Sequence, residues 1–331
     1  MASQETMKAL LLESFGTPFR LAEIERPMPA AGQVLVRVKA SAINPLDTKI
    51  RIGGAAHANH PLPAILGVDM AGTVEAVGSG VSDFRPGDDV YGMTGGVGGN
   101  QGSLAEYAAV DASLLARKPG NISMRDAAAL PLAFVTAWEG LVDRAKVSAD
   151  QTVLVIGAAG GVGHVVVQIA RARGAKVFAV DHGRRAEYLA SLGATAIDRD
   201  KEDVEAYVDR LTAGQGFDIV YDTIGGVGLD MAFKAVRRFG HVVSCLGWGA
   251  HVLAPLSFKA ATYSGVFTLL PLLTGEGRDH HGDIMREATK LVEAGQIVPR
   301  LDGRRFTLET TQQAYALIEG RQSDGKIVID V

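Results

Sequence analysis

Cysteine is nearly absent from the sequence, since Cys245 is the only one among 331 residues. A single cysteine excludes an intramolecular disulfide, and it also excludes any metal site that needs two or more thiolates. Neither a disulfide framework nor a thiolate-rich metal centre can therefore stabilise this fold.

The sequence also lacks an excess of positive charge and any long apolar run. Its formal net charge is −4, which provides no basic field for nucleic acid or for an anionic membrane. The apolar stretch GVFTLLPLL is far shorter than the roughly 20 residues that span a bilayer. The N-terminus shows no charged start followed by an apolar signal core. We therefore predict a cytoplasmic protein without nucleic-acid or membrane partners.

Glycine, in contrast, is abundant with 40 residues, and the chain is long enough for about two domains. In residues 7–125, short alternating segments such as Gln33–Ala40 are separated by glycine and proline. This pattern is typical of an antiparallel barrel or sandwich, and no helix-length periodic segment interrupts it. Helical patterns begin near Met124, with Pro131 at the start of a helix, where its missing N–H costs little.

Apolar strands then alternate with helices, which predicts an α/β region with a parallel sheet covered on both faces. The expected strands are Val153–Ile156, Val177–Val180, Ile219–Asp222, His241–Leu246 and Thr262–Phe267. Two more helices, around 283–294 and 311–319, and a final strand in GKIVIDV complete the chain.

The stretch AAGGVG follows the first of these strands and opens a helix. Small residues there let backbone N–H groups approach a pyrophosphate, and the helix N-terminus adds partial positive charge. The predicted cofactor-binding residues of this loop are Ala158, Gly160, Gly161, Val162 and Gly163, with Ala158 where the fingerprint usually has its first glycine. Asp181 ends the next strand at about the spacing of a ribose-binding acid. The alternative is a tight turn without a ligand.

A second glycine-rich stretch, around Gly95–Gly99, has β structure on both sides and no helix after it. We predict a flexible loop there, and the alternative is the lining of a substrate entrance.

Several long motifs occur together in one order: SAINPLDTKIR, PLPAILGVDMAGTVEAVGSGVSDFRPGDDVYG, GSLAEYAAV, LPLAFVTAWEGL, AAGGVGHVVVQIA and FDIVYDTIGG. With these motifs the chain resembles the medium-chain dehydrogenase/reductase superfamily and, within it, the zinc-free quinone oxidoreductase branch. The resemblance implies a GroES-like catalytic domain from residues 1–125 and 268–331. It also implies a Rossmann nucleotide-binding domain from residues 126–267 and a cleft for NAD(P)H.

The residues at the metal-ligand positions of this superfamily predict an enzyme without zinc. Val68 stands where the zinc-dependent members have a histidine ligand, and Asn44 stands where they have a cysteine. Valine has no donor atom for zinc. Without a metal, hydride transfer to an already electron-poor acceptor remains feasible, because one or two hydrogen bonds can hold the oxygen that becomes negative. We therefore predict reduction of a quinone or an α,β-unsaturated carbonyl.

Three residues are the catalytic candidates. Asn44 and Lys49 are expected to donate hydrogen bonds to the acceptor oxygen, and by resemblance their segment lines the nicotinamide end of the cleft. Thr136 matches a position that approaches the nicotinamide in relatives. The alternatives are a surface lysine for Lys49 and a threonine bonded to its own helix for Thr136.

The choice between the two nicotinamide cofactors rests on conflicting signals. Asp181 favours NAD, because a carboxylate repels a 2′-phosphate. Arg184 and Arg185 could clamp that phosphate, or they could form an exposed helix face. Asp222 and Thr223 are expected at the cofactor ribose, although Asp222 could instead cap the next helix. The resemblance favours NADPH slightly.

Two other functions remain open: a zinc-independent carbonyl or alcohol oxidoreductase, and a cofactor-binding module with little turnover. We also predict a homodimer, because a parallel sheet ends in an exposed edge. TYSGVF is the expected last strand, and the apolar run after it offers surface to bury.

Overall fold

The computed structural model describes residues 5–331, which form two compact units. The first unit contains the described residues up to Leu132 together with Leu269–Val331. The second contains Ala133–Thr268. No helix within the described residues is long and apolar enough to cross a bilayer.

The first unit is built around strand β3 (Gln33–Ile43), which pairs antiparallel with β5 (Asp69–Val77), β7 (Tyr107–Asp111) and β16 (Ile327–Asp330). The same sheet contains β6 (Asp89–Met93), β8 (Leu115–Arg117) and β15 (Phe306–Thr307); a smaller sheet contains β2 (Arg20–Glu25), β1 (Thr6–Leu12) and β4 (Ala64–Ile65). The alternating apolar side chains of β3 form the core, with Val34, Val36 and Val38 all buried. This confirms the predicted GroES-like β-rich part.

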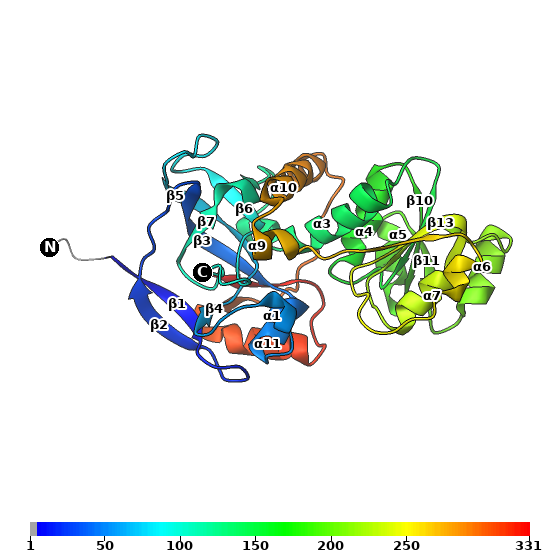
Figure 1. The fold of residues 1–331 in the computed structure, drawn as a ribbon, viewed down its shortest axis with the longest axis horizontal. Helices are drawn as coiled ribbons and strands as arrows, with labels where there is room; N and C mark the ends of the chain where they lie inside the picture. The colour runs from blue at the N-terminus through cyan, green and yellow to red at the C-terminus, as the bar shows by residue number, and fades with distance from the viewer. Residues whose placement is uncertain (1–4) are drawn as a thin grey trace. The chain divides into compact units, whose positions relative to one another are not determined.

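Within residues 5–331, five α-helices and three short 3-10 turns accompany these sheets. They are α1 (Pro45–Arg51), α2 (Met124–Ala128), α9 (Leu270–Thr274), α10 (Arg278–Glu293), α11 (Thr311–Glu319), η1 (Ala56–Ala58), η2 (Ala112–Leu114) and η5 (Leu308–Thr310). Helix α1, which lies beside α11 (Figure 1), was not expected from the sequence. It spans seven residues, which is too short for a periodic apolar pattern to reveal it.

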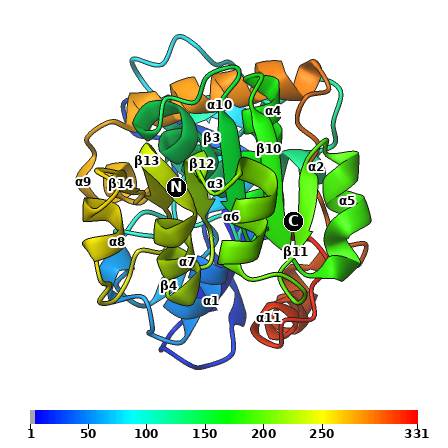
Figure 2. The same cartoon turned by 90° about the vertical axis from the view of Figure 1, so that its right-hand side faces the viewer.

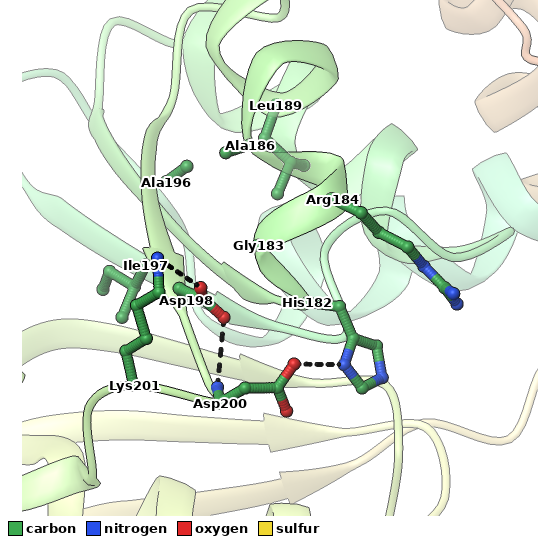
Figure 3. Close-up of a pocket in the computed structure, with 10 residues that line it drawn as sticks. All are labelled: His182, Gly183, Arg184, Ala186, Leu189, Ala196, Ile197, Asp198, Asp200 and Lys201. Carbon is green, nitrogen blue, oxygen red and sulfur yellow. Dashed lines mark hydrogen bonds and ion pairs between the residues drawn. The ribbon is translucent and has the colours of Figure 1, made fainter.

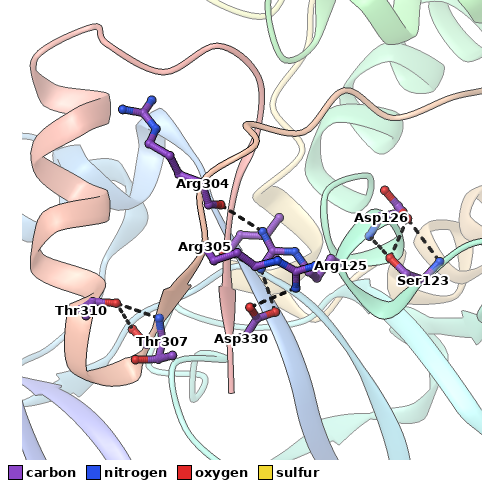
Figure 4. Close-up of polar contacts among 9 residues, drawn as sticks. Ser123, Arg125, Asp126, Arg304, Arg305, Thr307, Thr310 and Asp330 are labelled. Carbon is purple, nitrogen blue, oxygen red and sulfur yellow. Dashed lines mark hydrogen bonds and ion pairs between the residues drawn. The ribbon is translucent and has the colours of Figure 1, made fainter.

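The C-terminal strand is fixed to the first unit by charged groups as well as by its ladder. Arg125 of α2 lies 2.7 Å from Asp330 of β16 and donates to the carbonyl of Arg304 (Figure 4). Asp330 also lies 3.5 Å from Arg305. Segments from both ends of the sequence are therefore part of one unit.

The second unit contains a parallel sheet in the order β11-β10-β9-β12-β13-β14. Its strands are β9 (Thr152–Ile156), β10 (Lys176–Asp181), β11 (Thr195–Asp198), β12 (Phe217–Asp222), β13 (Val236–Ser244) and β14 (Thr262–Gly265). Five of these were predicted, and β11 is additional. The order, with β9 next to β12, is that of a doubly wound sheet and confirms the Rossmann-like class.

Helices cover this sheet, as Figure 2 shows. They are α3 (Pro131–Trp138), which begins in the first unit, η3 (Glu139–Arg144), α4 (Gly163–Ala172), η4 (Gly183–Arg185), α5 (Ala186–Ser191), α6 (Val204–Thr212), α7 (Val227–Ala235) and α8 (Ala254–Ser257). Tyr207 of α6 and Phe233 of α7 pack against strand residues such as Leu154 and Val220. The intervening strand residues, such as Val153 and Val155, are equally buried, because side chains of a strand alternate between two covered faces.

The second glycine-rich stretch is packed rather than flexible, which overturns our expectation. Gly95, Gly96 and Val97 are buried. The N–H of Gly98 donates to the carbonyl of Ala58, and the Asn100 side chain donates to the carbonyl of Leu272. Glycine is used there for close approach, since a Cβ at Gly95 would lie 1.8 Å from a backbone oxygen.

Candidate functional site

The loop from Ala158 to Gly163 joins β9 to α4 and presents unpaired donors. Within residues 5–331, the backbone N–H groups of Gly161, Val162 and Gly163 make no hydrogen bond. They lie at the N-terminus of a ten-residue helix, where such groups and the helix dipole attract anions. The loop therefore has the donors that a pyrophosphate needs.

Gly163 and Gly161 differ in the structural reason for having no side chain. A Cβ at Gly163 would lie 2.2 Å from the carbonyl oxygen of Gly157, so only glycine fits between helix and strand. A Cβ at Gly161 would meet nothing within 4 Å. Gly160 lies between these cases, with 3.2 Å to the same oxygen. Open space beside Gly161 is what a ligand-binding position requires.

Asp181, at the end of β10, is joined to this loop. One of its carboxylate oxygens accepts from the N–H of Ala159 at 2.9 Å, and the other accepts from the N–H of His182 at 2.8 Å. The carboxylate therefore helps to fix the loop. Each oxygen keeps a further lone pair, so a ribose hydroxyl can still bind there.

Asp222 and Thr223, at the end of β12, also serve as braces. Asp222 is fully buried and accepts from the N–H groups of Ile224 and Gly225 at 3.0 Å. Burial raises the pKa of the Asp222 carboxyl. The hydroxyl of Thr223 donates to the carbonyl of Ile156 at 2.8 Å. These side chains bond to the strand ends and to the turn before α7. Asp222 does not cap α7 itself, because the N-cap of that helix is Gly226 and it has no side-chain cap bond.

A pocket of about 430 Å³ opens beside the end of β10 (Figure 3). Its rim holds the pair His182–Asp200 at 2.8 Å and the pair Lys201–Asp198 at 3.5 Å. Arg184 also lines it and is exposed, with its guanidinium extending on the same side as the His182 ring. Arg185 ends the short η4 turn and does not line the pocket. This rim therefore carries charges of both signs.

Thr136 lies in α3 within the second unit and is buried. Its carbonyl oxygen accepts a 2.6 Å hydrogen bond from the Tyr221 hydroxyl of β12. Burial raises the pKa of Tyr221 well above its ordinary value. The hydrogen bond fixes the helix backbone at the predicted position.

In the first unit, Asn44 belongs to a buried charged cluster at the end of three adjacent strands. Strand register places Ile43 opposite Ile327 and Ala42 opposite Asp69, which brings Asn44, Asp69 and Lys326 together. The Asn44 amide donates to Asp69 at 2.9 Å and accepts from the Lys326 ammonium. That ammonium also lies 3.3 Å from the Asp69 carboxylate.

Asp47 completes the cluster from the first turn of α1. Its carboxylate accepts from the N–H of Asn44 at 2.8 Å and so caps the helix start. The side chain is fully enclosed, and its second oxygen has no partner among the described residues. Burial is the main reason that the pKa of Asp47 is raised to about 6, and the charge of Asp69 adds to the effect.

The two predicted donors of this segment have different environments. Asn44 is 1% exposed and its amide is engaged on both sides, whereas Lys49 is exposed on α1. Lys326 was not predicted, because the only signal for it is the pairing of β16 with β3, which the sequence does not display.

Comparison with known proteins identifies the family. Residues 30–120 match the model of the alcohol dehydrogenase GroES-like domain, and residues 161–273 match the model of the zinc-binding dehydrogenase family. Over 305 residues, the chain is 37% identical to a 2-methylene-furan-3-one reductase of Solanum lycopersicum, with 90% of this chain and 71% of the relative covered. It is 38% identical to a chloroplastic NADPH-dependent alkenal/one oxidoreductase of Arabidopsis thaliana, with 90% and 72% covered.

Solved structures agree with this. A crystal structure of an alcohol dehydrogenase superfamily protein from Novosphingobium aromaticivorans is 59% identical, with a TM-score of 0.97 and coverage of 98% of this chain and 100% of that one. The quinone oxidoreductase from Coxiella burnetii is 28% identical, with a TM-score of 0.83 and coverage of 99% and 100%. The chain belongs to the medium-chain dehydrogenase/reductase superfamily.

The zinc positions of this medium-chain dehydrogenase/reductase protein do not fit the metal. Val68 is buried without a donor atom, and the Asn44 amide is already held by Asp69 and Lys326. Residues 5–331 contain no group of three or more histidine, cysteine or acidic side chains arranged for a metal ion. The zinc-free enzyme stays a prediction, which elemental analysis can check.

Proposed function

We propose that this protein is an NAD(P)H-dependent oxidoreductase that transfers hydride to a quinone or an α,β-unsaturated carbonyl without zinc. The observation that carries the proposal is the set of unpaired N–H groups at Gly161, Val162 and Gly163, which suits a dinucleotide pyrophosphate. The similar proteins are named as a 2-methylene-furan-3-one reductase, an NADPH-dependent alkenal/one oxidoreductase and a quinone oxidoreductase. When bound, the nicotinamide supplies the hydride.

We further propose that the cofactor is bound by one domain and that the other domain is catalytic. Residues 126–267 hold the cofactor through the loop Ala158–Gly163, with Asp181, Asp222 and Thr223 at its ribose side. Residues 1–125 and 268–331 form the catalytic domain. Asn44, Lys49 and Thr136 remain the proposed residues around the reacting groups; the engaged amide of Asn44 suits a positioning role, and the exposed Lys49 suits direct contact with the acceptor.

For the cofactor we propose NADPH. One relative is named as NADPH-dependent, and the exposed Arg184 beside His182 offers positive charge for a 2′-phosphate. Arg185 is a second candidate for that phosphate. The negative charge of Asp181 opposes this choice. Two backbone N–H groups already donate to its carboxylate, however, and partly offset that charge.

We propose a homodimer formed through strand β14. β14 ends the sheet order, so one of its sides has no partner strand among the described residues. Exposed apolar side chains lie in this strand and just before it, among them Tyr263 and Phe258. A second copy that extends the sheet would satisfy the strand edge and cover part of this surface.

Steady-state oxidation of NADPH and NADH, followed with a panel of quinones, enones, saturated ketones and alcohols, tests the function. We expect turnover with quinones or enones, little with saturated carbonyls, and a lower KM for NADPH. The purified protein should contain no stoichiometric zinc, and chelators should leave the rate unchanged. Turnover confined to alcohols and saturated ketones would favour the alternative oxidoreductase, and no turnover would favour a cofactor-binding module.

A further inference from the structure

The ammonium of Lys326 has one donor to spare. It donates to the Asn44 amide oxygen, and it lies 3.3 Å from the Asp69 carboxylate. An ammonium group has three N–H donors, and these two oxygens are its only partners in the described part of the chain. The Lys326 side chain is 8% exposed, whereas Asp69 is fully buried. Of the residues in this cluster, Lys326 therefore keeps the most exposed surface, and its third N–H has no partner among residues 5–331.

The ligand chemistry that fits such a donor is an oxyanion. A hydrogen bond from a fixed ammonium is strengthened by charge and by the low dielectric around it. Asp69 and Asn44 hold the ammonium in place before any ligand arrives, so no reorganisation is needed when negative charge develops. The Asp69 carboxylate also balances the buried positive charge.

We propose that Lys326 donates its third N–H to the oxygen of the electron-poor acceptor, an inference that rests on the proposed reductase function. When hydride bonds to the β-carbon of an enone, the alkene π-electrons shift and the carbonyl π-pair moves onto oxygen. The product is an enolate, whose α-carbon then takes a proton from solvent water. Lys326 stabilises the enolate oxygen, and a quinone oxygen is stabilised in the same way. Asn44 and Asp69 act as positioning residues.

A phosphate oxygen of the cofactor has the same chemistry as an enolate oxygen, so the experiment must separate these two sources. The probe for the acceptor oxygen is 4-nitrophenolate, whose absorbance reports binding in the presence of NADP⁺. The probe for phosphate is the dissociation constant of NADPH from its fluorescence. The rate with 2-cyclohexenone provides the third measurement.

The variants are chosen to keep the fold. Lys326→Met alone leaves the Asp69 charge buried without its partner, which is destabilising. The double variant Lys326→Met with Asp69→Asn removes both charges, and the Asn44 amide can turn over so that its oxygen accepts from the new amide at position 69. Lys290→Met is the control, because this lysine is an exposed residue of α10 paired with Glu287. Circular dichroism checks the fold of each variant.

We expect the double variant to bind 4-nitrophenolate about 10- to 100-fold more weakly and to reduce cyclohexenone more slowly by a similar factor. Its dissociation constant for NADPH should stay within about threefold of wild type. Unchanged nitrophenolate binding would overturn the proposal, and so would a loss confined to NADPH affinity, which assigns the N–H to phosphate. Lys326-dependent nitrophenolate binding in a protein that reduces no acceptor would support the oxyanion site and refute the proposed reductase.

Discussion

At the scale of single residues, Asp47 makes stability depend on pH. Its pKa is raised from 3.8 to about 6 in the folded protein, so between these values the native state holds a proton that the unfolded chain has lost. Stability therefore falls as pH rises through this window, by about 3 kcal/mol at 1.36 kcal/mol for each pKa unit. Below pH 4 and above pH 6 this contribution is constant.

Asp47→Asn keeps an acceptor for the N–H of Asn44 and removes the titrating group. We expect the variant to lose less stability than wild type between pH 4 and pH 6, in urea unfolding followed by circular dichroism. Asp203→Asn is the control, because Asp203 also accepts a backbone N–H bond at a helix start, that of Ala206 in α6, but is exposed. Identical pH profiles for wild type and Asp47→Asn would contradict the raised pKa.

At the residue scale, the sequence pointed to candidate residues that are neighbours in the chain and missed those that only strand pairing brings together. The glycine loop was identified because six consecutive residues carry its pattern between a strand and a helix. Lys326 was missed because its partner Asn44 is 282 positions away. The bracing bonds of Asp222 and Thr223 could not be foreseen either, since they depend on the path of the turn after β12.

At the scale of elements, the loop before α4 provides a direct test of cofactor binding. Gly161→Val places its side chain in open space, so the fold should persist. The added atoms should keep pyrophosphate from the backbone N–H groups and weaken NADPH binding about 30- to 150-fold, the equivalent of two charge-assisted hydrogen bonds. Fluorescence titration measures the dissociation constant.

Gly303→Val is the control for this variant, since Gly303 is exposed in the first unit and a Cβ there also meets nothing within 4 Å. It should bind NADPH as wild type does. Normal binding by folded Gly161→Val would mean that the loop is only a turn, and the reductase assignment would lose its main support.

Elements with continuous apolar character were predictable, and short or half-polar ones were not. Strands β9, β10 and β12 lie in the buried middle of the sheet, so apolar side chains on both faces marked them in the sequence. β11 escaped prediction because its four residues, Thr195–Asp198, are only partly buried at this sheet edge. Helix α1 was not predicted because capping by Asn44 and Asp47, rather than a periodic apolar pattern, defines it.

At the scale of the whole molecule, the two edges of the parallel sheet provide a matched pair for testing the dimer. Thr262 and Thr195 are exposed first residues of the edge strands β14 and β11. Thr262→Lys places charge on the proposed interface and should shift the protein toward monomer in sedimentation at micromolar concentration. Thr195→Lys should sediment as wild type. A wild-type protein that is already monomeric would remove the basis of the dimer proposal.

The pairing of β16 with β3 has a consequence for biosynthesis. On the ribosome, residues 133–268 are complete while Ile43 still lacks its partner Ile327. The first unit therefore stays incomplete until β16 is translated, and until then Ala40–Ile43 of its central strand lack a partner on the side opposite β5. During elongation the nascent chain therefore exposes an unpaired strand edge, whose free N–H and C=O groups are prone to pair with other chains. Chaperone contact and aggregation of stalled or prematurely terminated chains should accordingly concentrate on the N-terminal strands.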